Sequence, residues 1–296
     1  MSETAEIEQT LNGAPKTNRF KEFWETLFAS KSATVGLIII VFLIIVAVFG
    51  RFFTPYDPTA SDMANVFKLP SAAHWLGTDD LGHDILSRII AGAAISLRVG
   101  VLAVAIALIC GTVLGSVAAY FGKTADMIIM RVMDMMLAIP DILLAIAIMT
   151  ALGPGIDKAI IAISFVTIPQ YARIVRGSIL SAKEQDYVAA ARLTGCSHMR
   201  IIFRHILPNV VSPIIVRSTL GVSSAILDTA ALGFLGLGVQ PPFAEWGTML
   251  GAGRAFIHNA PYICIFPGLA ITMTVLAFNL FGDGLRDAFD PRGRIK

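Results

Sequence analysis

The feature of this chain that most limits its fold is a polar, basic stretch, residues 181–208, which lies between two long apolar runs. It reads SAKEQDYVAAARLTGCSHMRIIFRHILP and carries four Lys or Arg side chains. Placing that many charges in hydrocarbon costs several kcal/mol in total. We therefore expect this stretch, called the platform below, to lie in water at one face of a membrane. Its basic excess predicts the cytoplasmic face.

Apolar runs on both sides of the platform predict six transmembrane helices. They cover residues 33–53, 95–121, 127–152, 157–176, 208–237 and 262–281. About 20 residues at 1.5 Å each cross a hydrocarbon core of about 30 Å. Hydrophobic residues make up 55% of the 296 residues and charged residues 15%, a balance typical of a membrane protein. Six crossings place both termini on one side, which the distribution of Lys and Arg predicts to be the cytoplasm.

Small residues and a proline add local predictions within these runs. Gly111 and Gly115 form a GxxxG step, which lets a second helix approach closely. Pro140 predicts a kink in the run 127–152.

The remaining segments divide the chain into four parts. We expect a cytoplasmic tail with an amphipathic surface helix (1–32), a first transmembrane helix with an outer loop (33–93), a five-helix core that includes the platform (94–287), and a cytoplasmic C-terminal tail (288–296). The amphipathic helix rests on apolar residues at helical spacing, and packing against a soluble partner is the alternative. These residues are Phe20, Phe23, Trp24, Leu27 and Phe28.

Within the platform, the pattern indicates a helix, a glycine stop and a second helix. Ser181 and Glu184 have the spacing of a capping box, which predicts that the first helix begins there. Gly195 predicts where this helix ends, and Ser197 predicts the cap of the next. The second helix is expected to bury one face, made of Met199, Ile202, Phe203 and Ile206. From these residues alone, an ordinary basic loop remains the alternative.

The platform resembles the coupling motif of ABC import permeases, E-A-A-x-x-x-G-x(9)-I-x-L-P. Ala190, Ala191, Gly195 and the pair Leu207-Pro208 match it, while Ala189 replaces Glu and His205 replaces Ile. The resemblance implies a cytoplasmic helix that docks into a groove on an ATPase subunit. The residues it assigns to this coupling are Tyr187, Ala189, Ala190, Ala191, Gly195, Cys196 and Arg200.

Three further stretches, residues 74–88, 226–250 and 266–291, resemble the dipeptide, oligopeptide and nickel importers. The resemblance is to the shorter of their two paired membrane subunits and covers nearly the whole chain after residue 20, although His83 replaces a common Arg. It implies an all-α membrane protein with the fold of a type I ABC importer permease, which spans a bacterial inner membrane. Dipeptides, longer peptides, glutathione and chelated nickel are all carried by such relatives.

The resemblance also implies partners. They are a second permease subunit in a heterodimer, two ATP-binding subunits, and a periplasmic or extracellular substrate-binding protein, with a small peptide as cargo. ATP and Mg would bind to the partner subunits, so this chain is expected to hold no cofactor and to catalyse no reaction.

Four ionisable side chains are expected in or near the membrane. Arg131 and Asp134 stand at i and i+3, a spacing at which they can pair. Arg217 and Asp228 fall within a predicted span, where an ionisable residue marks either a functional site or an internal pair. Asp228 therefore has two interpretations, contact with a cationic group of the cargo or a structural pair, and the second is favoured.

The patterns that several other functions need are missing from the sequence. Gly122-Lys123-Thr124 lacks the upstream glycine of a phosphate-binding loop, because Val117 stands there. The histidines and aspartates of residues 74–84 lack zinc-site spacing, so we predict neither catalytic residues nor a metal. A net charge of +2 gives no indication of nucleic-acid binding. The alternative function is a proton-coupled secondary transporter of peptides or metal chelates, with Asp134, Arg217 and Asp228 as a relay.

Overall fold

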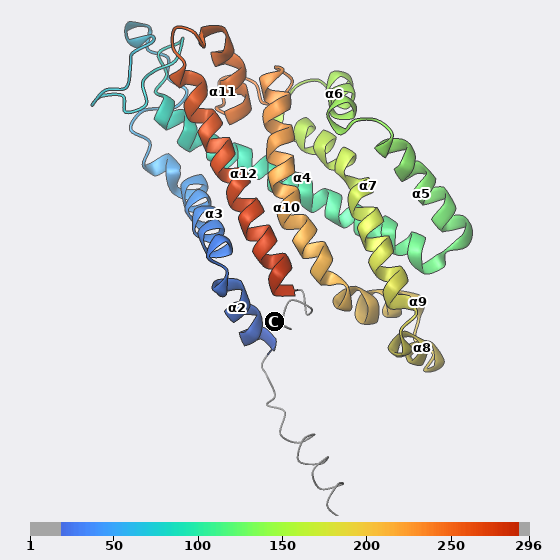
Figure 1. Cartoon of the computed structure of the whole chain (residues 1–296). Helices are drawn as coiled ribbons and strands as arrows, with labels where there is room; N and C mark the ends of the chain where they lie inside the picture. Colours follow the sequence, from blue (N-terminus) through green and yellow to red (C-terminus); the bar gives the residue numbers. More distant parts are fainter. Residues whose placement is uncertain (1–18, 290–296) are drawn as a thin grey trace, which may run out of the picture.

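The computed structural model describes residues 19–289, and the predictions made for residues 1–18 and 290–296 lie outside this range. Every element in the described range is helical, apart from one isolated bridge between Thr78 and Asp84. The long helices run between two ends of the molecule (Figure 1). The loop end holds residues 54–84, α6 and α11, and the platform end holds α2, α8 and α9. The described chain starts and finishes at the platform end.

Within residues 19–289, five helices are long and apolar enough to cross a membrane. They are α3 (Lys31–Phe49, extended by the short helix η1, Gly50–Phe52), α4 (Ile85–Phe121), α7 (Ile156–Lys183), α10 (Val211–Phe234) and α12 (Tyr262–Phe289). Each overlaps a predicted apolar run, and α4, α7 and α12 extend well beyond theirs.

The predicted span 127–152 is not a single straight helix. It is a pair, α5 (Lys123–Leu137) and α6 (Asp141–Leu152), and the two axes differ by 91°. The predicted kink at Pro140 is confirmed, because Pro140 stands at the N-cap of α6, where its missing N–H removes no helical hydrogen bond. Counted as one crossing, the pair brings the total to six.

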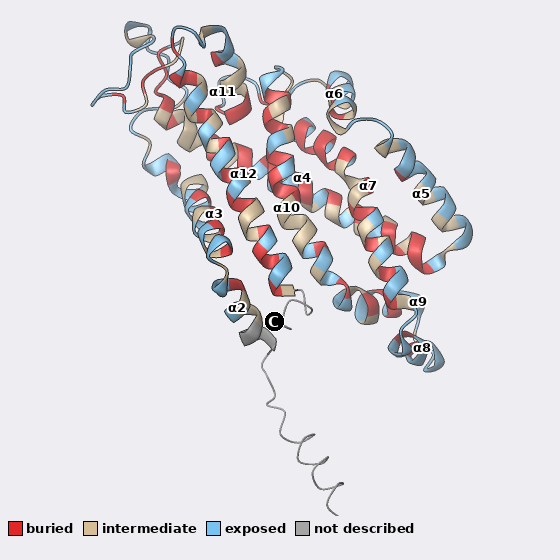
Figure 2. Ribbon diagram, in the orientation of Figure 1, coloured by how far each residue is buried: buried red, intermediate tan, exposed pale blue. Residues whose placement is uncertain are grey.

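Helices α4 and α7 pack against each other at close range, as the glycine step predicts. A Cβ atom on Gly111 would lie 2.4 Å from Cβ of Tyr171, and one on Gly115 would lie 2.5 Å from the carbonyl oxygen of Ala172. No side chain fits at either position, which makes these glycines a requirement of the contact. Buried residues gather along α4, α7 and α10, whereas α5 is exposed over most of its surface (Figure 2).

At the loop end, residues 243–260 form a short helix and a turn, and the start of this segment is buried against the bundle. Helix α11 (Trp246–Gly253) is capped by Glu245, whose carboxylate accepts hydrogen bonds from the backbone N–H groups of Gly247 (2.8 Å) and Thr248 (2.9 Å). Glu245 and Trp246 are each only 1% exposed. Burial raises the pKa of Glu245. The capped helix therefore belongs to the core of this end of the molecule.

Helix α2 (Arg19–Ala29) lies at the platform end and packs against the last turns of α12. Leu27 is buried there beside Leu285, and the rings of Phe23 and Phe289 are 4.9 Å apart. Trp24 and Phe28 stack on each other and remain partly exposed. One part of the predicted amphipathic face thus packs on the protein itself, and the other part stays open to a membrane surface.

Candidate functional site

The platform begins later than the capping-box spacing predicts. Ser181 lies inside α7, which continues to Lys183 because Ile179 and Ala182 are buried against the neighbouring helices. The Lys183 ammonium donates hydrogen bonds to the carbonyl oxygens of Ala119 (3.3 Å) and Tyr120 (2.9 Å) in the last turn of α4. A cation at the C-terminal end of a helix is favoured by the helix dipole. The predicted helix start at Ser181 is therefore wrong.

The first platform helix, α8, covers Asp186–Leu193 and ends at the predicted glycine. Gly195 has φ of +76°, and its N–H donates to the carbonyl oxygen of Arg192 (3.0 Å). The next N–H, from Cys196, donates to the carbonyl oxygen of Ala191 (3.1 Å). These two bonds define a Schellman motif, which turns the chain sharply with its backbone groups satisfied.

The second part of the platform differs from the predicted regular helix. After α9 (His198–Arg200), residues Ile201–Ile206 form a π-helical turn, η3, and Leu207–Asn209 a 3₁₀ turn, η4. A π turn carries more residues than an α turn, so the buried side chains are Ile201, Ile202 and Ile206. Met199 and Phe203, which α-helical spacing placed on the buried face, are 59% and 55% exposed.

The platform presents an exposed apolar surface at its end of the molecule. We call it the platform patch, and its members are Tyr187, Leu193, Met199 and Phe203. Leu193 is 90% exposed, the largest exposed fraction among the large apolar side chains of the described residues. Large apolar side chains left exposed on the platform, outside the membrane-spanning helices, indicate a protein or membrane contact. Sequence analysis missed Leu193, although its place just before the glycine stop of an amphipathic helix was a usable signal.

The residues that sequence analysis assigned to coupling fall into two groups. Ala189, Ala190, Gly195 and Arg200 are exposed alongside Tyr187, where a partner can reach them. Ala191 is buried, and Cys196 packs partly on the same apolar cluster beneath α8. Ala191 and Cys196 therefore hold the platform helix in place, and the exposed residues form the surface that a partner can contact.

Contacts with α4 fix the platform to the membrane helices. The Tyr120 hydroxyl and Nδ1 of His198 are 2.8 Å apart, and the two rings meet edge to face. The Arg192 guanidinium lies 5.8 Å from the centre of the Tyr120 ring, within reach of a cation–π attraction. Together with the hydrogen bonds of Lys183, these contacts join the platform to the end of α4, so we expect the two to move together.

Acidic residues of α5 pair with basic residues of α7 near the platform end. Asp134 pairs with Arg173 (2.8 Å), and Asp126 pairs with both Nε (2.5 Å) and Nη2 (2.6 Å) of Arg176. The predicted pair between Arg131 and Asp134 is therefore not the one that forms. Arg131 is exposed and has no ion pair within residues 19–289. The two cross-helix pairs fasten α5, which buries little apolar surface of its own, to the bundle.

A polar ladder joins α6, α7 and α10 within the membrane helices. An Nη2–H of Arg217 donates to Oε1 of Gln170, and Nε2–H of Gln170 donates to Oδ2 of Asp141 (3.0 Å). Asp141 also lies close enough to Asp228 for an electrostatic interaction. All four side chains are half-buried. Hydrogen bonds thus join Arg217 to Asp141 through Gln170, and sequence analysis singled out neither Gln170 nor Asp141.

Arg217 and Asp228 share one face of α10. They are separated by three helical turns, so the rise between them is about 16 Å. Ser224 lies on the same face and is exposed. Together with Gln170 of α7 and Asp141 of α6, these residues gather a cationic group, a hydroxyl, an amide and two carboxylates where the three helices meet.

Two family models match the sequence. "Binding-protein-dependent transport system inner membrane component" matches residues 111–295, and "N-terminal TM domain of oligopeptide transport permease C" matches residues 18–70. The first covers the platform and the polar ladder, and the second covers α2, α3 and the first part of the loop of residues 54–84.

Curated relatives match over nearly the whole chain. A dipeptide transport system permease protein of Alkalihalophilus pseudofirmus is 50% identical over 92% of this chain and 90% of its own length. A di/tripeptide transport system permease protein of Pseudomonas aeruginosa is 47% identical over 92% of each chain. A glutathione transport system permease protein of Escherichia coli is 48% identical over 92% of this chain and 90% of its own.

Solved structures share the fold at low sequence identity. An inward-facing structure of the MetNI methionine ABC transporter aligns with a TM-score of 0.58 and 16% identity, over 70% of this chain and 98% of that one. An amino acid ABC transporter aligns with a TM-score of 0.54 and 16% identity, over 68% of this chain and 94% of the other. The predicted importer-permease fold is confirmed by these alignments.

Proposed function

Because this chain belongs to the family of inner membrane components of binding-protein-dependent transport systems, as a permease subunit of an ABC importer, we propose that it forms half of a membrane pathway for dipeptides or other short peptides. One observation carries the choice of cargo, the 50% identity to a dipeptide permease over nine-tenths of both chains. The half-buried charged groups of α10, Arg217 and Asp228, support it, because a peptide with two charged termini needs polar groups along its route.

The proposed assembly contains a second permease subunit, two ATP-binding subunits and a substrate-binding protein. The platform end would face the cytoplasm with both termini, in keeping with the basic residues gathered there. The platform patch would dock on an ATP-binding subunit. When ATP closes the two ATP-binding subunits, the platform moves as one body and the packed helices switch between inward-open and outward-open arrangements.

Reconstitution tests this function directly. The chain would be purified with its co-expressed partners and placed in proteoliposomes. The labelled dipeptide and the binding protein would be added outside the vesicles, and ATP would be enclosed inside them. We expect uptake that stops without ATP and continues with a protonophore. The proton-coupled alternative predicts the reverse, since it depends on the proton gradient. Uptake by this chain alone, without any partner subunit, would also contradict the proposal.

The polar ladder gives a prediction about cargo. Replacing Asp228 with Asn removes a negative charge from the α10 face and preserves the side chain's shape. We expect uptake of a dipeptide with a free amino terminus to fall about tenfold, because a charge-assisted contact contributes about 1.5 kcal/mol or more in a partly dry pathway. Transport assays with free and N-acetylated dipeptides would measure it.

Asp134→Asn is the matched control, because Asp134 is exposed and pairs with Arg173 near the platform end. We expect this change to leave the preference for a free amino terminus intact. If Asp228→Asn lowers uptake of both dipeptides equally, Asp228 acts only within the bundle.

A further inference from the structure

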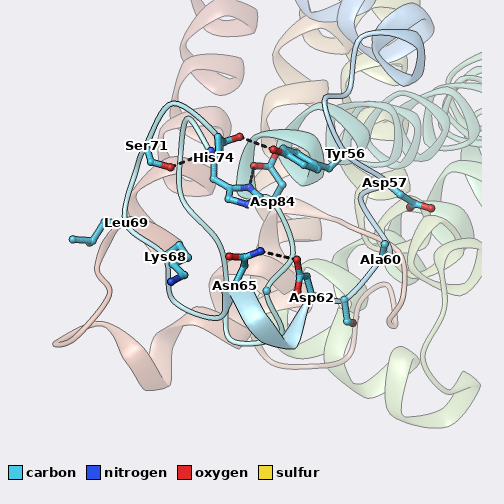
Figure 3. A pocket seen from close by; sticks show the side chains of 13 residues that line it. Tyr56, Asp57, Ala60, Asp62, Asn65, Lys68, Leu69, Ser71, His74 and Asp84 are labelled. Carbon is cyan, nitrogen blue, oxygen red and sulfur yellow. Dashed lines mark hydrogen bonds and ion pairs between the residues drawn. The ribbon is translucent and has the colours of Figure 1, made fainter.

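The loop of residues 54–84, at the end of the molecule opposite the platform, forms a half-open cavity of about 500 Å³ (Figure 1 and Figure 3). Its walls come from this loop alone and include the aromatic Tyr56, the aliphatic Leu69 and the carboxylates of Asp57, Asp62 and Asp84. A volume of this size accepts a small molecule or one or two side chains of a partner.

Hydrogen bonds within the loop hold these walls in place. Oδ1 of Asp84 lies 3.0 Å from Nδ1 of His74, and both side chains are buried. The Tyr56 hydroxyl donates to the carbonyl oxygen of Ala73 (2.9 Å), and the Tyr56 ring lies 4.7 Å from the ring of His74. Oδ2 of Asp62 accepts a bond from Asn65 (2.7 Å). The cavity is thus formed before any ligand arrives, which lowers the entropic cost of binding.

The loop is acidic, in contrast to the rest of the chain. Residues 54–84 contain five aspartates and one lysine, whereas the whole chain has a net charge of +2. Three of those aspartates and Lys68 line the cavity. Hydrogen bonds from Thr59 lower the pKa of Asp57, and those from Asn65 and Ala64 lower the pKa of Asp62. Both groups therefore stay ionised at neutral pH and present negative charge to the solvent.

An amphipathic cation fits this lining. The Tyr56 ring is 41% exposed and Leu69 is 68% exposed, so both can cover the methylene stem of a long basic side chain. An ammonium or guanidinium beyond that stem would reach the carboxylates, and an aromatic face adds a cation–π attraction. Asp84 is buried and bonds to His74, whereas Asp57 and Asp62 are exposed, so the latter two are the carboxylates that a cation can reach.

We propose that this cavity receives a lysine or arginine side chain of the substrate-binding protein and so orients that protein on the permease. The proposal rests on the proposed function, which places the loop end outside the cell and a binding protein above it. We choose this occupant because its charge is complementary to that of the loop. An acidic patch attracts a basic partner and fixes the orientation in which it binds. The contact would form each time the binding protein delivers its cargo.

The test uses the complete importer in lipid nanodiscs and measures ATP hydrolysis against the concentration of binding protein, at saturating dipeptide. In the variant Asp57→Asn/Asp62→Asn, amide oxygens replace the carboxylates and can still accept the bonds from Thr59 and Ala64. We expect the half-saturating concentration of binding protein to rise about three- to tenfold, the combined effect of two exposed charge contacts. The difference should shrink as salt is added.

Two single variants sharpen the test. Lys68→Gln removes the one cation of the lining and should lower the half-saturating concentration. Asp157→Asn removes an exposed charge from the first turn of α7, at the same end but outside the cavity, and should change nothing. An unchanged value in the double variant would overturn the proposal, as would an equal effect of Asp157→Asn. A change in the peptide dependence alone would assign the cavity to the cargo and overturn it too.

The wild-type complex separates this proposal from the proposed function. If no binding protein stimulates its ATP hydrolysis, the function itself is contradicted and the cavity's assignment falls with it. If the wild type is stimulated and the charge variants behave like it, only the cavity's assignment fails.

Discussion

Replacing Leu193 with Asp should reduce ATP-driven uptake about 30-fold, since losing a central apolar contact of an interface costs about 2 kcal/mol or more. Leu193 is 90% exposed, so the change removes almost no contact within this chain. The Asp carboxylate would instead have to be buried against the ATP-binding subunit, where no basic or hydrogen-bonding group is placed to compensate its charge. Uptake and ATP hydrolysis in proteoliposomes would measure the effect, and we expect hydrolysis to lose its dependence on the binding protein.

Leu193→Met is the matched control, because methionine keeps an apolar side chain of similar volume. Its uptake should stay close to that of the wild type. Gly195→Trp should reproduce the loss by another route, because Gly195 has φ of +76°, a conformation that residues with a side chain rarely adopt. If Leu193→Asp transports normally, the platform patch is not the contact with the ATP-binding subunit.

The second large effect is expected at Gly115, where α4 meets α7. A Cβ atom there would lie 2.5 Å from the carbonyl oxygen of Ala172, and backbone cannot move aside as a flexible side chain can. We expect Gly115→Leu to destabilise the permease by about 3 kcal/mol or more, at the upper end of overpacking effects. Thermal unfolding in detergent and the yield of assembled complex would measure it.

Gly177→Ala provides the comparison, because a Cβ atom at this position of α7 meets nothing within 4 Å. Alanine favours a helix more than glycine does, so the variant should be as stable as the wild type or slightly more stable. A Gly115→Leu variant that assembles and unfolds like Gly177→Ala would mean that the helices do not pack as closely as the structure shows.

Local patterns predicted much of the fold. The apolar runs located the membrane helices, Pro140 located the bend between α5 and α6, and Gly195 located the end of α8. Each of these features depends on the chemistry of a few neighbouring residues. The GxxxG step also predicted a close contact, although it did not identify α7 as the partner.

Features that depend on distant residues were missed. Asp134 pairs with Arg173, 39 residues away, because the bend at Pro140 lays α5 beside α7. Gln170 and Asp141 had no signal of their own, since their role appears only when α6, α7 and α10 come together. The π turn at Ile201–Ile206 shifted the buried face, because an α-helical period was assumed where the backbone has another.

One helix connects the two surfaces to which partners are assigned. Helix α4 contains 37 residues without a break, so it is about 55 Å long, and it runs obliquely to α10 and α12 (Figure 1). Its first turn is capped by Asp84, in the wall of the outer cavity, and its last turn holds the platform through Tyr120. A helix this long moves as one stiff body, so a tilt imposed at the platform end would also displace the loop of residues 54–84. The cavity proposed to receive the binding protein would then move during each ATP cycle, and no chain of side-chain contacts between the two ends of α4 would be needed.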